Sequence, residues 1–158
     1  MADTVLNTTV FDGAKKLITH YNVVSDNAGS TTKIVDVSAL ASNNGKTCKT
    51  VRLNKVSFNV SVTAPADAIR MQWDASSDVV FQTLAGEMEY DYSSFGGLKN
   101  TEASGFTGDV NVVLPACTDG DTGTIVCEWI KVYESLEFKW LILLREQQRS
   151  TKLLLLMK

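Results

Sequence analysis

The sequence predicts an all-β fold, an antiparallel β-sandwich or a jelly-roll-like domain of seven to nine short strands. Apolar and polar residues alternate with period two over much of residues 15–133, as they do in strands with one buried face. Clusters of Gly, Asn, Asp and Pro interrupt the alternation about every 8–15 residues, as turns do in a sandwich. A chain of 158 residues fits one domain and can bury a core without a disulfide or a metal.

The first predicted strand follows residue 15, where Leu17, Thr19, Tyr21 and Val23 share one face. A turn cluster follows at residues 26–30, and extended structure resumes over residues 33–37. Residues 38–49, which contain Asn43-Asn44-Gly45, are expected to form a loop or a single helical turn.

The longest strand candidate, residues 50–62, changes its apolar phase in the middle. Val51 and Leu53 occupy odd positions, whereas the apolar residues from Val56 onward occupy even ones. A slip of one residue moves every side chain to the other face unless a bulge absorbs it. We therefore predict a bulge, or a strand that changes sheets, near Asn54–Lys55.

Pro65 ends this strand, and the next strand points Ile69, Met71 and Trp73 inward. Residues 74–78 then form a turn. Residues 79–84 are too uniformly apolar to alternate, and this favours a central strand. The following strand alternates Met88, Tyr90 and Tyr92 with Glu87, Glu89 and Asp91.

Gly and Ser dominate a long loop over residues 95–108. Val110, Val112 and Leu114 line one face of the next strand. Residues 119–123, Asp-Gly-Asp-Thr-Gly, predict a hairpin turn, because Asp-Gly tolerates the positive φ that such turns need. The last strand, residues 124–133, places Ile125, Cys127 and Trp129 on one face and Val126, Ile130 and Val132 on the other.

The last 25 residues differ in character, so we divide the chain into a β-sandwich domain (1–133) and an amphipathic tail (134–158). Leu136, Trp140, Leu143 and Leu144 form one helical stripe, the possible partner contact of a tail that is either helical or poorly ordered. The apolar ending, residues 153–157, is expected to pack back on the body or to dock on a neighbouring subunit. The break at Glu134 also resembles the seam of a frameshift or readthrough.

Charge and composition restrict the kinds of partner that the chain can bind and the cellular compartment in which it is expected. Residues 1–133 carry ten Lys and Arg against fifteen Asp and Glu, and this argues against nucleic acid as a partner. The longest apolar runs fall far short of the roughly 20 residues of a membrane helix. The N-terminus does not resemble a signal peptide. Three cysteines without a C-x-x-C pair favour free thiols in a reducing compartment, although one Cys117–Cys127 bridge stays open.

No residue pattern predicts catalysis, a metal or a cofactor. His20, the single histidine, lies mid-strand on the polar face, with no second histidine and no Gly-x-Ser-x-Gly motif to support it. The carboxylates of Glu87, Glu89 and Asp91 are interpreted as a solvated face of an edge strand rather than a glycosidase pair. Asp119-Gly120-Asp121 lacks the acidic twelfth residue of a calcium loop and is interpreted as a turn.

Aromatic residues on the predicted strands suggest a sugar-stacking platform as an alternative. We expect Trp73 in the core and leave Tyr90, Tyr92 and Phe95 as contacts for a partner or a glycan.

Five segments carry a resemblance to a known group of proteins. They are residues 1–13, 16–26, 71–75 (Met-Gln-Trp-Asp-Ala), 93–98 (Ser-Ser-Phe-Gly-Gly-Leu) and 105–110 (Gly-Phe-Thr-Gly-Asp-Val). They resemble small virion structural proteins of marine tailed phages, including T4-like cyanophages. The resemblance covers residues 1–133 and ends after Tyr133, where such proteins tend to stop.

The resemblance implies a non-enzymatic virion protein that decorates the capsid, or else a neck, tail or fibre component. It implies no catalytic residues. Its expected partners are the major capsid or neck and tail proteins of the same particle and further copies of itself. A carbohydrate-binding β-sandwich module is the alternative from another class.

Overall fold

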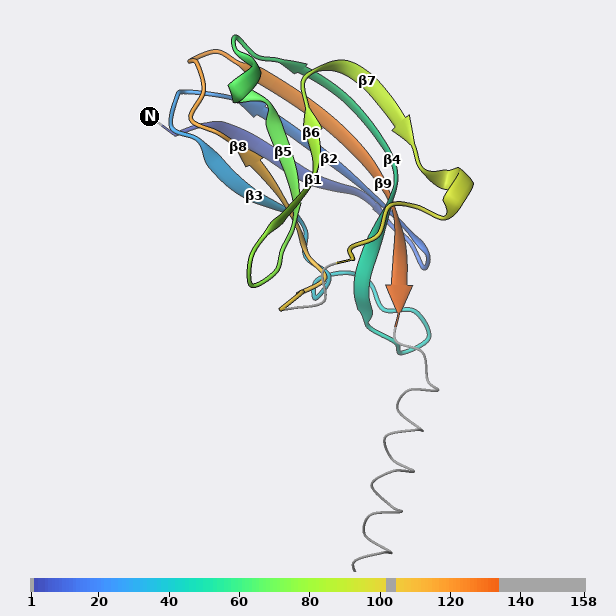
Figure 1. Ribbon diagram of the computed structural model, residues 1–158. Coiled ribbons are helices and arrows are strands. Elements are labelled where there is room, and N and C mark those ends of the chain that lie inside the picture. The colour runs from blue at the N-terminus through green and yellow to red at the C-terminus, as the bar shows by residue number, and fades with distance from the viewer. Residues whose placement is uncertain (1, 102–104, 134–158) are drawn as a thin grey trace, which may run out of the picture.

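Two antiparallel sheets pack face to face in the computed structural model, which describes residues 2–101 and 105–133 (Figure 1). The strands are β1 (Thr4–Asp12), β2 (Lys16–Val24), β3 (Ser30–Val35), β4 (Cys48–Ser61), β5 (Ile69–Trp73), β6 (Val79–Leu84), β7 (Gly86–Asp91), β8 (Val110–Leu114) and β9 (Thr122–Tyr133). Two 3₁₀ turns, η1 (Pro65–Asp67) and η2 (Ser93–Phe95), lie in the connections. The predicted all-β sandwich is confirmed.

The strand order is that of a jelly roll with one strand added. The first sheet has the order β1-β2-β9-β4-β7 and the second has the order β3-β8-β5-β6. Strands β2 to β9 form four nested antiparallel pairs: β2 with β9, β3 with β8, β4 with β7 and β5 with β6. This nesting defines the eight-stranded jelly roll. Strand β1 lies outside it, at the edge of the five-stranded sheet beside β2.

The core lies between the sheets and is built from the alternating apolar residues of their inner faces. Trp129 is fully buried at its centre, and its indole nitrogen donates a hydrogen bond to Oγ1 of Thr19 at 3.0 Å. Trp73 packs edge-on against Trp129 and stacks on Phe81 with ring centroids 4.1 Å apart. Ile69, Met71 and Trp73, predicted to point inward from β5, are buried, and so are the residues predicted to share one face of β2, of β8 and, with Trp129, of β9.

The predicted bulge in the longest strand is confirmed. The register between β4 and β9 shifts between Leu53 and Lys55, so that Val51 and Leu53 before the bulge and Val56 after it all face the core. The carbonyl oxygen of Asn54 at the bulge accepts a hydrogen bond from the Tyr92 amide at 2.8 Å. The bulge therefore also anchors the connection that follows β7.

Two predictions about how strands pair are wrong. Residues 79–84 do not form a central strand, because β6 is an edge strand that, among the described strands, pairs only with β5, and Val80 is 45% exposed. Residues 119–123 do form a tight turn, with Gly120 at φ 88°, but not a hairpin. The strands that they join, β8 and β9, belong to different sheets. The residues of a turn specify that the chain reverses. Which strand the next strand pairs with is determined by packing in the core.

Strand β1 was not among the strands expected from the alternation, because its residues do not alternate and most of its side chains are exposed. The loop before β4 contains a tight turn closed by backbone bonds between Asn43 and Lys46. Cys48, Cys117 and Cys127 are buried free thiols, so the open alternative of a Cys117–Cys127 bridge is not realised.

Within the part of the chain that the structure describes, no helix has the length and apolar character to cross a membrane. The predicted docking stripe (Leu136, Trp140, Leu143 and Leu144) lies outside the described residues, so the prediction for the tail stays a prediction.

Candidate functional site

Three residues singled out from the sequence lie together beside β7. The Tyr90 and Tyr92 rings stack with centroids 6.2 Å apart and planes 15° apart, and Phe95 follows at 5.8 Å from Tyr92. Phe58 on β4 continues the series inward, 5.9 Å from Tyr90. We call these four rings the aromatic row. Tyr90 belongs to β7 and Phe95 to η2, and Figure 1 shows β7 leading towards η2 at one margin of the sandwich.

The position of the aromatic row follows from the β7 register. Tyr90 pairs with Val56 and therefore faces the inner side of the sheet, yet it lies on an edge strand and is only half-buried. Burial falls along the row, from Phe58 at 5% exposure to Phe95 at 64%. The 3₁₀ turn that carries Phe95 is held by Asp91, whose Oδ1 accepts a hydrogen bond from the Ser93 amide. The aromatic row thus extends from the buried core at Phe58 to the solvent-exposed surface at Phe95.

One polar contact links the aromatic row to the other sheet. The hydroxyl of Tyr92 donates a hydrogen bond to Oε1 of Gln82 on β6 at 2.8 Å. Partial burial raises the pKa of the Tyr92 phenol, and its protonated hydroxyl is the donor in this bond. Gln82 was not singled out from the sequence, because no pattern indicates that β6 and β7 form neighbouring margins of two sheets.

The carboxylates of β7 lie on the opposite face of that strand, on the outer side of the five-stranded sheet. Asp91 forms an exposed ion pair with Lys55 at 2.6 Å, and this contact, with the bonds from Ser93, holds its carboxyl pKa well below the usual range. The edge position predicted for this acidic face is confirmed.

Next to this acidic face lies a shallow depression of about 320 Å³ over β4, β7 and β9. Its lining includes Ser57, Asn59, Glu87, Glu89 and Val126. The depression is on the outer face of the five-stranded sheet, so Glu87 and Glu89 do not share a surface with the aromatic row.

His20 lies on the same outer face, in the middle of β2, between Thr8 of β1 and Val126 of β9 in the strand register. Neither cross-strand neighbour is an acid or an activated nucleophile. The expectation that His20 belongs to the polar face of its strand is confirmed.

In the Asp119–Asp121 turn, the carboxylate of Asp121 has a structural role, because it binds the segment that follows β4. Asp121 is buried and accepts hydrogen bonds from the Thr63 amide at 3.1 Å and the Thr63 hydroxyl at 2.9 Å. Across residues 2–101 and 105–133, no three His, Cys, Asp or Glu side chains lie close enough together to hold a metal ion.

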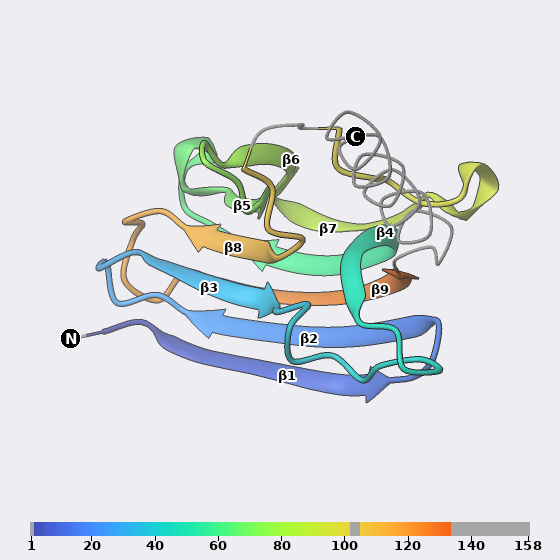
Figure 2. The ribbon, with the colours of Figure 1, turned by 90° about the horizontal axis from the view of Figure 1, so that it is seen from below.

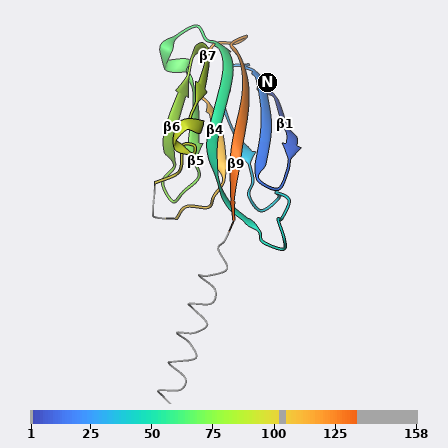
Figure 3. The same ribbon diagram turned by 90° about the vertical axis from the view of Figure 1, so that its right-hand side faces the viewer.

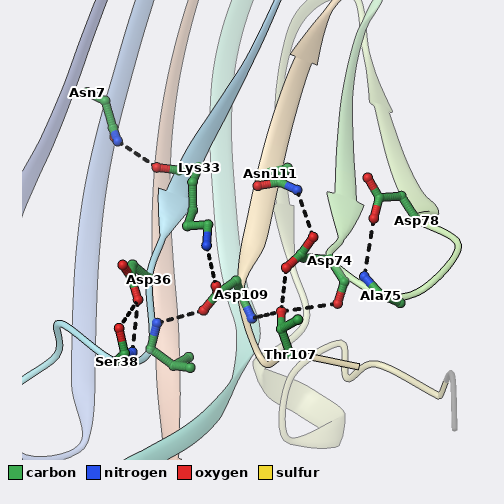
Figure 4. A network of polar contacts seen from close by, with 11 residues as sticks. Asn7, Lys33, Asp36, Ser38, Asp74, Ala75, Asp78, Thr107, Asp109 and Asn111 are labelled. Atoms are coloured by element: carbon green, nitrogen blue, oxygen red, sulfur yellow. Dashed lines mark hydrogen bonds and ion pairs between the residues drawn. The ribbon is translucent and has the colours of Figure 1, made fainter. Parts of the chain in front are cut away.

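Other aspartates meet at one end of the sandwich, in the network of Figure 4. Asp109 accepts a bond from the Val37 amide at 2.9 Å and pairs with Lys33 at 2.6 Å. Asp74 accepts a bond from the Thr107 hydroxyl at 2.6 Å. Each carboxylate in this network is engaged by donors of the surrounding loops, which makes the network a clamp between β3, β8 and the loop after β5 rather than an acid–base pair.

We compared the chain with models of protein families, with curated proteins and with solved structures, and none of the three comparisons gave a match.

Proposed function

We propose that this chain is a non-enzymatic structural protein of a tailed-phage virion that decorates or stabilises the capsid. The observation that supports the proposal best is the jelly-roll order of β2 to β9. Jelly rolls recur in viral capsid domains and in lectins. The resemblance of residues 1–133 to small virion proteins of marine tailed phages favours the first of these two roles.

In this role the protein acts by binding other proteins of the particle through its surface, without catalysis. It assembles in the host cytoplasm onto major capsid proteins, or onto neck, tail or fibre proteins of the same particle. Many copies on one shell each need only modest affinity, because geometry makes the contacts multivalent. The aromatic row, with Phe95 64% exposed, is one candidate contact, and the stripe of residues 136–144 is the second.

Copy number in purified particles tests the proposal. Quantitative mass spectrometry of virions from the phage that encodes this chain should find it at a fixed ratio to the major capsid protein. Hundreds of copies place it on the capsid, whereas about six to twelve place it at the neck or tail, where the symmetry is lower. Absence of the chain from washed particles contradicts the proposal.

Carbohydrate binding is a second candidate, which the aromatic row specifically favours. Flat aromatic faces with a polar end, such as Tyr92 bonded to Gln82, combine apolar area with a directed hydrogen bond. Such a surface suits the apolar face of a sugar ring. The chain would then attach the particle, or any other carrier, to a glycan.

A glycan array probed with the full chain, followed by titration calorimetry, tests this second function. Binding should disappear in Phe95→Ala and persist in Phe11→Ala, which removes a similarly exposed phenylalanine from β1. No binding at about millimolar glycan, an affinity of roughly −4 kcal/mol, excludes it.

A further inference from the structure

The loop that joins β3 to β4 carries the single Asn-Gly pair of the sequence, Asn44-Gly45. The loop lies at the end of the sandwich where β1 turns into β2 (Figures 2 and 3). It is tied to the body at Ala41, whose carbonyl oxygen accepts a hydrogen bond from Lys131 and whose amide donates to Asp12. The Asn-Gly pair follows this tie along the chain.

Asn44 and Gly45 form the tip of a tight turn. The amides of Asn43 and Lys46 each donate to the carbonyl oxygen of the other residue at 3.0 Å, and these two bonds close the turn. Both tip residues are exposed, and their φ angles of 51° and 74° are left-handed. A Cβ added to Gly45 would meet no atom within 4 Å outside the two neighbouring residues. The tip is therefore held by two backbone hydrogen bonds and has open space around it.

An asparagine followed by a glycine can modify itself without a catalyst. The backbone nitrogen of the glycine attacks Cγ of the asparagine side chain and forms a new C–N bond. The bond from Cγ to the side-chain nitrogen breaks, and that nitrogen leaves as ammonia with the proton of the backbone amide. Water then opens the resulting succinimide at either carbonyl, which leaves an aspartate or an isoaspartate and one new negative charge. Water is the only co-reactant.

Two features favour this reaction at Asn44. The attacking amide is available, since no described residue accepts a hydrogen bond from the Gly45 nitrogen. Glycine also has no Cβ to hinder the approach of its nitrogen. Asn27 provides the contrast, because it is exposed with a similar φ of 73° but precedes an alanine. The amide of that residue, Ala28, donates to Oδ1 of Asp26 at 3.3 Å.

The reaction requires the turn to open, but not the domain. The Gly45 nitrogen reaches Cγ of Asn44 only after the Asn44 backbone rotates out of the turn conformation. Opening breaks the two hydrogen bonds between Asn43 and Lys46, neither of which belongs to the core. Openings of this size are local and leave the sheets intact. The folded protein can therefore react.

We propose that Asn44 is a site of spontaneous deamidation in the folded protein, through a succinimide formed with Gly45. The modification gives the tip of the turn a negative charge. It leaves the hydrogen bonds at Ala41 in place, so the free energy of unfolding should not change. The inference is independent of the function proposed above, because the reaction needs no partner.

Peptide mapping of the full chain by mass spectrometry tests the proposal. After several days at body temperature and mildly alkaline pH, Asn44 should gain about one dalton, whereas Asn27 should keep its mass. Fragment ions distinguish Asn44 from Asn43, and near-ultraviolet circular dichroism confirms that the incubated protein stays folded. Labelling with protein isoaspartyl methyltransferase should detect isoaspartate in the same peptide, since a succinimide opens on both sides. Equal gains at Asn44 and Asn27, or no isoaspartate at Asn44, overturn the proposal.

Gly45→Ala tests the attack by the following nitrogen. The added Cβ should slow deamidation of Asn44 by about tenfold or more, because it hinders that nitrogen. An alanine at φ 74° also strains the turn, and easier opening by itself would speed the reaction. Gly120→Ala is the matched control, since it places an alanine at φ 88° in a different turn and should leave the rate at Asn44 unchanged. An unchanged or faster reaction in Gly45→Ala overturns the proposal.

Discussion

The side-chain nitrogen of Lys131 lies 2.5 Å from Oδ1 of Asp12, and the lysine side chain is fully buried. The same ammonium donates to the carbonyls of Gly13 at 3.1 Å and Ala41 at 2.7 Å. A single cation from β9 thus joins the end of β1, the turn after it and the loop before β4. Burial of the charge acts to lower the pKa of Lys131, but the contacts with Asp12 and Tyr133 outweigh it and raise this pKa above its usual value. Its stabilising effect is therefore present at neutral pH and is lost only as the pH rises through that raised pKa.

Breaking this pair should be costly. Asp12→Asn leaves a buried cation without its counter-charge, and we expect a loss of about 3 kcal/mol in the free energy of unfolding, measured by urea denaturation. Asp91→Asn is the matched control. It breaks an exposed pair with Lys55, and we expect it to leave the unfolding midpoint unchanged. Equal effects of the two substitutions would contradict the structural role of Lys131.

Acid should weaken the outer face of the five-stranded sheet through Glu128. Its carboxylate pairs with Lys16 at 2.8 Å and accepts a bond from the Asn54 amide at 2.7 Å. The Lys16 contact is the main reason that the pKa of Glu128 is held below its ordinary value of 4.5. A lowered pKa adds stability above pH 4.5 that disappears as the pH falls through the folded-state pKa.

We therefore expect Glu128→Gln to be less stable than the wild type at pH 6, and this difference to narrow as the pH falls below 4.5. Lys16→Met should show the same narrowing, because it removes the partner that lowers the pKa. The measurement is urea denaturation over that pH range. A difference that stays constant with pH would rule out the contribution of Glu128.

The bulge at Asn54 should be indispensable. Removing this residue restores a regular strand and turns either Val51 and Leu53 or Val56 and its successors out of the core. We expect the deletion variant to lose the cooperative thermal transition seen by near-ultraviolet circular dichroism. A glycine inserted after Lys99, in the loop that follows Leu98, is the length control and should leave the transition intact.

Two glycines with similar φ angles should respond differently to alanine. Gly120 (φ 88°) has nothing within 4 Å of an added Cβ, so Gly120→Ala should cost about 1 kcal/mol, the strain of the left-handed conformation. A Cβ at Gly108 (φ 97°) would lie 2.1 Å from the Lys49 carbonyl oxygen, so Gly108→Ala should cost at least about 3 kcal/mol. Similar costs at both positions would show that the backbone next to Gly108 can move aside.

Much of this fold could be predicted because a strand with one buried face alternates apolar and polar residues along the sequence. The inward residues of β2, β5, β8 and β9 and the phase change at Asn54 were all visible in that way. The sequence pattern does not show which strands pair with one another. The turn residues at 119–123, for example, would be the same whether the next strand joined the same sheet or crossed to the other sheet. Strand β1 escaped prediction because neither of its faces is well buried.

The candidate site was visible only in part. The sequence singles out Tyr90, Tyr92 and Phe95 as possible contacts for a partner or a glycan, but their stacking depends on the edge position of β7. Gln82 joins them only because β6 and β7 are neighbouring margins of the two sheets, which no local pattern indicates. The Lys131–Asp12 pair joins residues 119 positions apart, a separation at which local sequence rules carry no information.

The most direct test of the proposed virion role is a cryo-electron-microscopy reconstruction of particles of a tailed phage whose genome encodes this chain. We expect a nine-stranded jelly-roll density bound at symmetry-related sites on the capsid or on the neck and tail, and its absence from particles assembled without the gene. Complete particles in which no such density occurs would contradict the assignment.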